Sequence, residues 1–288
     1  MKQRKLGRGV ALVGAGMSKF GAFPGKATRD LFVDAFQSML ASVDNGFDPQ
    51  EIEALYIGNY SSDLFEGQGH TAPIMADWVG LTPRPATRIE DACASSGVAV
   101  REGIIAVASG LYDIVLVGGI EKMTDLPTSE VTDTLATAAD VLYEVPAGFT
   151  FPGLYAAMAT AYMDAYGATP ETFMRVGIKN HENGALNAKA QFGKRIVDIM
   201  ARKKAKAERK GYPIPTWKDE MDFLHDNRAN PTIAWPMRLY DCSPISDGAA
   251  ALLLVSEELA KHFTDAPLHV IGSGQASDTA LHDRDDVT

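Results

Sequence analysis

The sequence predicts an α/β fold, and three local patterns carry this prediction. Residues 85–118 contain a short extended segment, a helix over 97–109, and a second extended segment from Asp113 to Gly118. The second extended segment is a near-continuous apolar run, which is typical of a buried strand in a parallel sheet. Ala249 to Val255 is another apolar run of strand length. A strand, a helix and a strand at this spacing form a βαβ unit.

The elements before this unit fit the same class. Val10 to Val13 is the first expected strand, and the Gly14-Ala15-Gly16 turn after it lacks the third glycine of a dinucleotide-binding loop. A helix is expected from Thr28, which can cap it, and its apolar residues recur at helical spacing through Val43. Asp48-Pro49 predicts a short helical turn, followed by a strand over Ala54 to Gly58.

The texture of the chain changes in its middle third. Residues 123–237 are rich in glycine, proline and methionine and include an expected helix over Tyr155 to Ala165. Residues 238–288 return to α/β texture, where Ser256 can cap a helix after the strand. The sequence therefore predicts three segments: 1–122 in an α/β layer structure, 123–237 as an insertion, and 238–288 returning to the first part.

Composition and charge exclude several functional classes. The 288 residues are 46% hydrophobic and 22% charged, enough for a sizeable core. A net charge of −10 argues against nucleic acid as the main partner. The apolar run after Ala249 is far too short to span a membrane, and the basic start of the chain leads directly into a strand, so we expect a cytoplasmic protein. Two cysteines do not form a secreted disulfide framework.

Cys93 is the strongest candidate for chemistry. It lies where the extended segment ending at Ile89 passes into the apolar helix of 97–109, which Ser95 or Ser96 can cap and which we expect to be buried. A thiol at the first turn of a helix meets unpaired N–H groups and the positive end of the helix dipole, and both favour the thiolate. The alternative is a small hydrophobic core residue, a frequent role of free cysteine.

Four segments, in order along the chain, resemble landmarks of the thiolases. The similarity is greatest to archaeal acetyl-CoA acetyltransferases and sterol-carrier-protein-type thiolases. The segments are Glu90-Asp91-Ala92-Cys93-Ala94-Ser95-Ser96-Gly97, Val117-Gly118-Gly119-Ile120-Glu121-Lys122-Met123, Asn180-His181-Glu182-Asn183-Gly184-Ala185-Leu186-Asn187, and Asp241-Cys242-Ser243-Pro244-Ile245-Ser246-Asp247-Gly248-Ala249.

The resemblance implies a thiolase-like N-terminal α/β/α half, with 123–237 as its mostly helical loop domain. The family's C-terminal half supplies an Asn, a His in Gly-His-Pro and a second Cys in Cys-x-Gly, and none of these motifs occurs in this sequence. We therefore expect the C-terminal catalytic half to be missing from this sequence. A truncated chain, a natural fragment and one subunit of a split enzyme all remain open.

The resemblance also implies a chemistry. A thiolase performs Claisen condensation, or the reverse thiolysis, through an acyl-cysteine intermediate, here on Cys93, with acetyl-CoA, acetoacetyl-CoA or another 3-ketoacyl-CoA as substrate. Coenzyme A thioesters are then substrates, and no cofactor or metal is expected, since the histidines show no zinc-ligand spacing. The alternatives are a non-catalytic lipid-binding or scaffold subunit, and a ketoacyl synthase, which would need paired histidines.

Further site residues follow from the same resemblance. Ser243 corresponds to a serine that contacts pantetheine, Met123 to a methionine of the acyl pocket, and His181 to a position near the thioester. Their structural alternatives are a turn, core filling and a loop-ordering hydrogen bond, in that order. Cys242 is expected in the core, and Asp247 in a turn.

The resemblance extends to binding partners. The basic stretch from Lys194 to Lys210 is either a solvated helix face or a cradle for the phosphates of coenzyme A. Resembling enzymes form homodimers through the strands before the catalytic cysteine, and higher oligomers or a complex with a zinc-containing OB-fold protein occur among archaeal relatives. We expect acyl-CoA and a second copy of the chain as partners, with a complementing thiolase half as a third.

Overall fold

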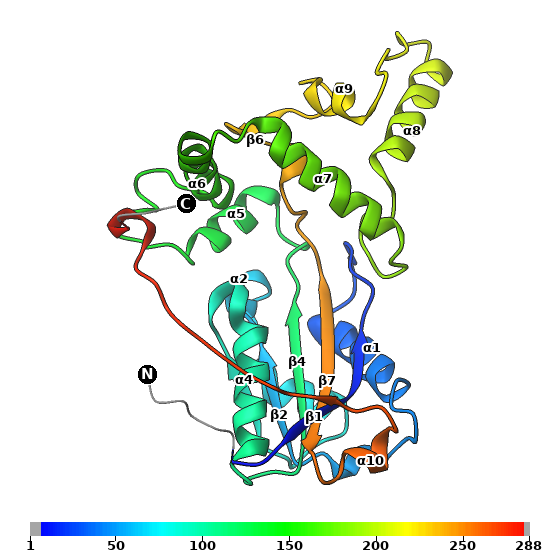
Figure 1. Ribbon diagram of the computed structural model, residues 1–288, viewed down its shortest axis with the longest axis vertical. Coiled ribbons are helices and arrows are strands. Elements are labelled where there is room, and N and C mark those ends of the chain that lie inside the picture. The colour runs from blue at the N-terminus through cyan, green and yellow to red at the C-terminus, as the bar shows by residue number, and fades with distance from the viewer. Residues whose placement is uncertain (1–6, 285–288) are drawn as a thin grey trace. The chain divides into compact units, whose positions relative to one another are not determined.

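The computed structural model describes residues 7–284, which form two compact units (Figure 1). Unit 1 contains the described residues up to Pro127 together with Ser246–Ser277. Unit 2 contains Thr128–Ile245 and the described residues from Asp278 onward. The chain thus leaves unit 1 after Pro127 and returns after Ile245, whereas the sequence pattern places the corresponding boundaries at 123 and 238.

Unit 1 is built on a six-stranded mixed sheet with the order β3-β2-β4-β7-β1-β8. β2 pairs in parallel with both β3 and β4, while β7 is antiparallel to β4 and β1, and β8 is antiparallel to β1. The strands are β1 (Val10–Met17), β2 (Ala54–Gly58), β3 (Ala86–Ile89), β4 (Ile114–Glu121), β7 (Gly248–Ser256) and β8 (Leu268–His269). The predicted α/β class and the βαβ unit around Cys93 are confirmed.

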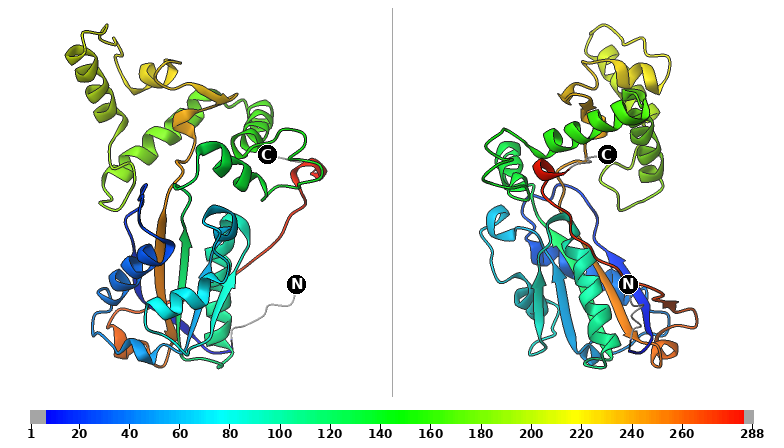
Figure 2. Two further views of the ribbon diagram at one scale, coloured as in Figure 1. Left: turned by 180° about the vertical axis from the view of Figure 1, so that it is seen from behind. Right: turned by 60° about the vertical axis from the view of Figure 1, so that its left-hand side comes forward.

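Helices cover both faces of this sheet (Figure 2). Because side chains alternate along a strand, Leu116 of β4 and Leu253 of β7 pack toward α1 and α3, while Val115 and Val117 pack toward α4. The helices of unit 1 are α1 (Thr28–Leu40), α2 (Ser62–Phe65), α3 (Thr71–Trp78), α4 (Ser95–Ala108) and α10 (Ala260–Phe263), with short 3-10 turns at Pro49–Glu51 and Ala92–Ala94. The sheet thus carries two separate apolar clusters, one on each face.

Helix α4 differs from its prediction as a fully buried helix. Ala99 and Val107 are fully buried against the sheet, but Ile105 is 40% exposed and Gly97 is also exposed. Helix α4 is apolar on all sides, but among the described residues unit 1 buries one of its faces.

The residues that cap the helices differ in part from those predicted. Asp48 caps the Pro49–Glu51 turn as predicted, accepting a hydrogen bond from the backbone N–H of Gln50. Thr28 does not cap α1, because Ala27 is the N-cap residue and the Asp30 carboxylate accepts from the Ala27 N–H. Neither Ser95 nor Ser96 caps α4, whose N-cap residue is Ala94.

Unit 2 is mostly helical, as the texture of 123–237 predicts. Its helices are α5 (Thr128–Ala136), α6 (Phe151–Tyr166), α7 (Pro170–Ala185), α8 (Ile196–Arg209) and α9 (Glu220–His225), followed by the short β5 (Thr232–Ala234) and β6 (Met237–Arg238) and 3-10 turns at Leu239–Asp241 and Leu281–Asp283. Gly167 ends α6 in a left-handed conformation, and Pro170 begins α7 at its first turn. The apolar core of unit 2 joins α7, α8 and α9 around Met174, Met200 and Phe223.

None of the helices described over residues 7–284 is both long and apolar enough to cross a bilayer.

Candidate functional site

Cys93 lies in a tight turn between strand β3 and helix α4. The turn Ala92–Ala94 is a 3-10 turn that leads directly into α4, and the Cys93 side chain is exposed. Ala92 has a φ of 44°, a left-handed conformation that is unfavourable for a residue with a Cβ. This geometry resembles the strained strand-to-helix elbow that presents a nucleophile to substrate.

Side chains next to Cys93 hold this turn in its strained shape. The Ser95 hydroxyl accepts a hydrogen bond from the Asp91 N–H at 2.8 Å and donates to the Ala92 carbonyl at 2.7 Å. The Glu90 carboxylate accepts from the Ala92 N–H at 2.6 Å. Ser95, a candidate helix cap in the sequence, therefore fixes the backbone on both sides of the left-handed residue.

Two glycines let the first turn of α4 rest directly on the sheet. A Cβ atom at Gly58, the last residue of β2, would overlap the backbone of Ser96. A Cβ atom at Gly119 of β4 would overlap the Ser96 side chain. Glycine at both positions thus brings the start of α4 against the carboxyl ends of β2 and β4.

Met123 follows strand β4 and lies in a loop fixed by a buried ion pair. Lys122 Nζ is 3.0 Å from Asp247 Oδ2, and both side chains are fully buried. The Asp247 carboxylate also accepts from the backbone N–H groups of Phe23, Met123 and Thr124. Met123 and Cys93 thus follow strands β4 and β3, whose carboxyl ends lie at the same edge of the sheet.

The ionisation of this pair reflects its hydrogen bonds. Burial would raise the pKa of Asp247, but hydrogen bonds from Thr124, Phe23 and Lys122 outweigh it, so the pKa lies below its usual value. Burial would lower the pKa of Lys122, but its bonds to Asp125 and Asp247 outweigh this and raise it. The sequence predicted that Asp247 shapes a turn. In the structure, its carboxylate links its own segment to the segments of Phe23 and Thr124.

His181 and Ser243 belong to unit 2. The His181 ring nitrogen Nδ1 lies 2.8 Å from the Lys194 carbonyl, and the ring stacks on Phe192 with centroids 5.9 Å apart. The His181 ring also lies beside Tyr240, at 5.7 Å between centroids. Ser243 is exposed, three residues after Tyr240. Cys93 and Met123 therefore belong to one compact unit, and His181 and Ser243 to the other.

Cys242 has a different environment from Cys93. It is only partly exposed, and burial, with a smaller effect from the Asp241 carboxylate, raises the pKa of its thiol. Raised pKa values disfavour the reactive thiolate. Its surroundings fit the structural role expected from the sequence.

The basic stretch forms helix α8, and part of its charge serves the fold of unit 2. Lys204 Nζ donates to the Trp217 carbonyl at 2.7 Å, and Lys203 Nζ lies 5.1 Å from the centre of the Phe223 ring. Arg195 pairs with Asp198 at the start of the helix. Arg202 and Lys206 are exposed on α8. Of the basic residues named here, the exposed Arg202 and Lys206 are the ones that could form either a solvated helix face or a cradle for phosphates.

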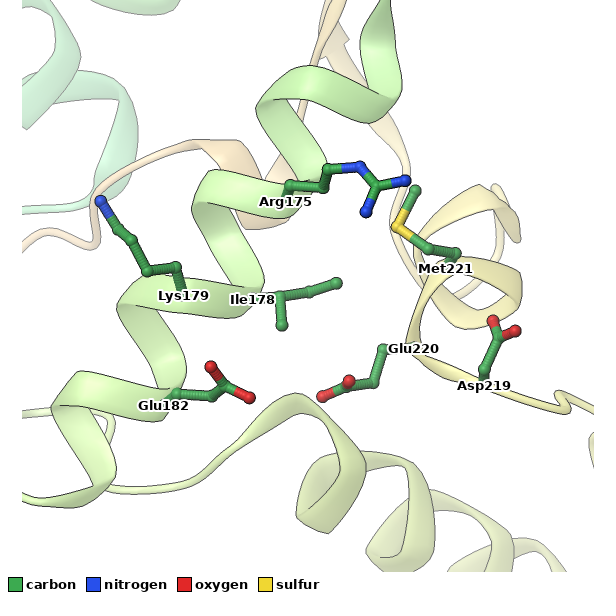
Figure 3. Close-up of a pocket in the computed structure, with 7 residues that line it drawn as sticks. All are labelled: Arg175, Ile178, Lys179, Glu182, Asp219, Glu220 and Met221. Carbon is green, nitrogen blue, oxygen red and sulfur yellow. The ribbon is translucent and has the colours of Figure 1, made fainter.

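A pocket of about 460 Å³ lies between α7 and the start of α9 in unit 2 (Figure 3). Its lining combines basic, acidic and apolar side chains: Arg175, Ile178, Lys179, Glu182, Asp219, Glu220 and Met221. In Figure 3 the carboxylates of Glu182 and Glu220 point toward each other, and the Lys179 ammonium points away from them. Facing carboxylates repel an anion, so this pocket is a poor site for a phosphate.

Sequence reasoning assigned no role to two charged residues at the carboxyl end of β4. Glu121 is the last residue of this otherwise apolar strand and Lys122 follows it, and this abrupt change to charged residues was the available signal. Burial raises the pKa of Glu121, although hydrogen bonds from Tyr60 and Ser61 and the charge of Arg88 act against the shift. Among residues 7–284, no cluster of three or more His, Cys, Asp or Glu side chains is arranged to hold a metal ion.

Comparison with known proteins gives a consistent family. A family model described as "Thiolase, N-terminal domain" matches residues 10–258. The chain is 42% identical over 282 residues to an acetyl-CoA acetyltransferase of Methanothermobacter thermautotrophicus, covering 98% of this chain and 66% of the relative. It is 39% identical over 284 residues to an acetyl-CoA acetyltransferase of Methanocaldococcus jannaschii, covering 98% of this chain and 65% of that protein.

The fold has counterparts among solved structures. A structure described as "Ltp2-ChsH2(DUF35) aldolase" superposes with a TM-score of 0.70 at 24% identity, covering 98% of this chain and 66% of the matched chain. This likeness concerns the fold. The chain thus spans 65–66% of the length of each of these three proteins.

Proposed function

Because the chain belongs to the thiolase family, we propose that it takes part in acyl transfer between coenzyme A thioesters, with Cys93 carrying the acyl group. The observation that carries this proposal is the exposed Cys93 thiol in a left-handed turn at the start of α4. A buried structural cysteine needs neither exposure nor backbone strain. The relatives' printed activity, acetyl-CoA acetyltransferase, supports an acetyl or acetoacetyl group as substrate.

The first proposed step loads the acyl group. The Cys93 thiolate attacks the carbonyl carbon of the thioester, and a new C–S bond forms. The bond from that carbon to the sulfur of coenzyme A then breaks, and coenzyme A leaves as a thiolate that takes up a proton. The Cys93 backbone N–H, at the start of α4, would stabilise the negative oxygen of the tetrahedral intermediate.

The second proposed step needs groups that we do not assign to this chain. A base must remove a proton from the α-carbon of a second acyl-CoA, and donors must stabilise the resulting enolate. The Asn, His and second Cys motifs that supply them in resembling thiolases are absent from this sequence. We therefore propose that the chain holds the acyl group and that a complementing C-terminal half supplies the base.

The substrate contacts proposed for unit 1 and unit 2 differ in kind. Met123 would line the acyl pocket, because its backbone is held by the buried Asp247 at the edge of the sheet that carries Cys93. Ser243, exposed after the Leu239–Asp241 turn, would contact pantetheine. His181 is proposed near the thioester, with its ring held by the Lys194 carbonyl and Phe192. The exposed Arg202 and Lys206 would attract the phosphates of coenzyme A.

Acyl loading can be tested on the chain itself. We expect incubation with acetyl-CoA or acetoacetyl-CoA to place one acetyl or acetoacetyl group on the peptide that contains Cys93, seen by mass spectrometry. Cys93→Ser should abolish the labelling, and Cys242→Ser should leave it unchanged. Labelling of Cys242 in place of Cys93 would contradict the proposal. A chain that takes up no acyl group would favour a non-catalytic scaffold.

Turnover separates loading from condensation. We expect no detectable thiolysis of acetoacetyl-CoA by the chain alone, since each missing oxyanion donor costs about 10²–10³ in rate. Adding a complementing half with the Gly-His-Pro and Cys-x-Gly motifs should restore turnover. Robust thiolysis by the isolated chain would show that a catalytic base lies within these residues.

Assembly is a separate proposal. β3 is an edge strand of the sheet, four residues long and only partly buried, and an edge strand of this kind can pair across a twofold axis. We propose a homodimer through this edge, which light scattering would detect. The printed name of the matched structure includes DUF35, and we propose a partner of that kind for this chain.

A further inference from the structure

Glu121 ends strand β4 and binds the turn that follows strand β2. One oxygen of its carboxylate accepts a hydrogen bond from the Tyr60 N–H at 2.8 Å. The other accepts from the Ser61 N–H at 3.3 Å and from the Asn59 side-chain amide at 3.1 Å. One carboxylate therefore satisfies two consecutive backbone donors and one side chain in the same turn.

The same turn is held from its other side by strand β3. Arg88 Nη2 donates to the Tyr60 carbonyl at 2.9 Å, and its Nη1 pairs with Asp63 at 2.7 Å. The Asn59 N–H donates to the Ile89 carbonyl at 3.1 Å, which extends the β2–β3 ladder by one bond. Glu121 thus accepts hydrogen bonds from the N–H groups of the turn, and Arg88 donates hydrogen bonds to its carbonyl groups.

This clamp, the hydrogen bonds of Glu121 and Arg88 to the Asn59–Ser61 turn, lies close to the nucleophile turn, Ala92–Ala94, which contains Cys93. Ile89 is separated from Cys93 by Glu90, Asp91 and Ala92. Gly58, the residue before Asn59, and Gly119, two residues before Glu121, are the two glycines on which the first turn of α4 rests. Figure 1 shows α4 beside strands β2 and β4. A shift of either strand end would therefore move the start of α4.

The choice of glutamate at this position is costly for stability. Burial raises the pKa of Glu121, and the Glu66 carboxylate adds to the shift, with Arg88 as the compensating charge. A neutral glutamine would avoid the cost of placing a charge there, although it would supply one acceptor oxygen in place of two. A partly buried carboxylate that accepts three hydrogen bonds from one turn, at the strand ends on which the start of α4 rests, indicates a role in fixing that turn.

We propose that Glu121 is a positioning residue for Cys93: by clamping the Asn59–Ser61 turn to the end of β4, it sets the two strand ends that support the nucleophile turn. This inference rests on the proposed function of Cys93 as acyl carrier. Glu121 contacts no reacting atom in this proposal. It acts through Gly58, Gly119 and the β3 end on the orientation of the thiol.

Glu53 provides a matched control. Its carboxylate also accepts hydrogen bonds from two consecutive backbone N–H groups, those of Asp113 and Ile114. These donors lie at the start of β4, the opposite end of the strand from Glu121. Both bonds end at one oxygen, Glu53 Oε2, so Glu53→Gln makes the same charge-removing exchange at the opposite end of β4 while leaving one acceptor oxygen for these donors.

The test compares Glu121→Gln with Glu53→Gln in the full chain. We expect Glu121→Gln to lower the rate of acyl loading at saturating acetyl-CoA about 10-fold, with little change in the half-saturating concentration, because small misplacements of a reacting group cost up to about 10²-fold. Glu53→Gln should change this rate less than about twofold. Circular dichroism and urea unfolding establish that both variants are folded under the assay conditions.

A second measurement is independent of acyl transfer. The rate of Cys93 alkylation by iodoacetamide, followed by peptide mapping across pH, should change in its pH profile in Glu121→Gln and match the wild type in Glu53→Gln. If wild-type Cys93 takes up no acyl group, the proposed function fails, and the alkylation profile still decides the role of Glu121. A folded Glu121→Gln with wild-type loading and alkylation overturns the inference.

A conservative variant covers the case in which Glu121→Gln does not fold. Glu121→Asp keeps the charge and both acceptor oxygens but shortens their reach by one methylene. We expect the pH profile of Cys93 alkylation in Glu121→Asp to differ from that of the wild type. A folded Glu121→Asp with wild-type loading and alkylation would likewise overturn the inference.

Discussion

Unit 1 and unit 2 are stabilised in different ways. Unit 1 has apolar clusters on both faces of one sheet, with strands that come from distant parts of the chain, such as β4 and β7. Unit 2 has one small cluster around Phe223, and polar contacts hold its loops, such as those of Arg238 with the carbonyls of His225 and Asn230. We infer that unit 2 opens more readily than unit 1, because few buried contacts give low local stability.

The largest expected effect is in the core of unit 1. Phe32 is fully buried on α1, and its ring occupies the space that the absence of a side chain at Gly118 leaves over the sheet. We expect Phe32→Ala to lower the free energy of unfolding by about 4 kcal/mol, since it leaves a cavity against a rigid sheet. Urea unfolding measures this change.

The control for this prediction is Phe192→Ala, because Phe192 is 50% exposed. We expect this exchange to lower the free energy of unfolding by less than about 1 kcal/mol. Equal losses for the two variants would mean that burial against the sheet does not distinguish Phe32, and the comparison between the units would lose its basis.

A smaller effect is expected for the same exchange in unit 2. Phe223 is fully buried and packs edge-on against Trp217 and Tyr240, with ring centroids 5.0 and 5.3 Å away. We expect Phe223→Ala to lower the free energy of unfolding by about 3 kcal/mol, because the smaller core of unit 2 can partly close the cavity. Hydrogen exchange should become faster in α8 and α9 and stay slow in β4 and β7. Faster exchange in β4 would contradict independent stability of the two units.

The smallest expected effect is a difference between Asp247 and Glu121 of unit 1 in how their contributions to the free energy of unfolding depend on pH. The pKa of Asp247 is lowered, so its contribution to stability is present above the usual Asp pKa and is lost as the pH falls through the lowered value. The pKa of Glu121 is raised by burial, so its contribution is present below the usual Glu pKa and is lost as the pH rises through the raised value.

Urea unfolding as a function of pH measures both effects. Relative to the wild type, the free energy of unfolding of Glu121→Gln should improve as the pH rises from about 4 to 8, across the range of a raised carboxyl pKa. Asp247→Asn should have a lower free energy of unfolding than the wild type, and this difference should shrink as the pH falls below about 4, the usual Asp pKa. Parallel curves for the two variants would show that the two carboxylates do not differ in this way.

Local patterns predicted the elements of unit 1 well. The strand over Ala54 to Gly58 was predicted with the bounds that the structure shows, because an apolar run between turn residues determines it locally. The strand-to-helix turn at Cys93 was also predicted, since proline and β-branched residues precede it and an apolar helix follows. The cap of α4 was wrong, because Ser95 forms its hydrogen bonds within the Cys93 turn.

By itself, the sequence determined the order of the strands and helices, the βαβ unit, and the position of Cys93 at a helix start, because these depend on neighbouring residues. Only the tertiary structure decided that β7 lies antiparallel between β1 and β4, and that Lys122 pairs with Asp247 although the two residues are 125 positions apart. It also decided that the Glu121 carboxylate binds the turn after β2, 60 and 61 positions earlier in the chain. Contacts of this range depend on how strands pair, and no periodicity or propensity within a short segment encodes that pairing.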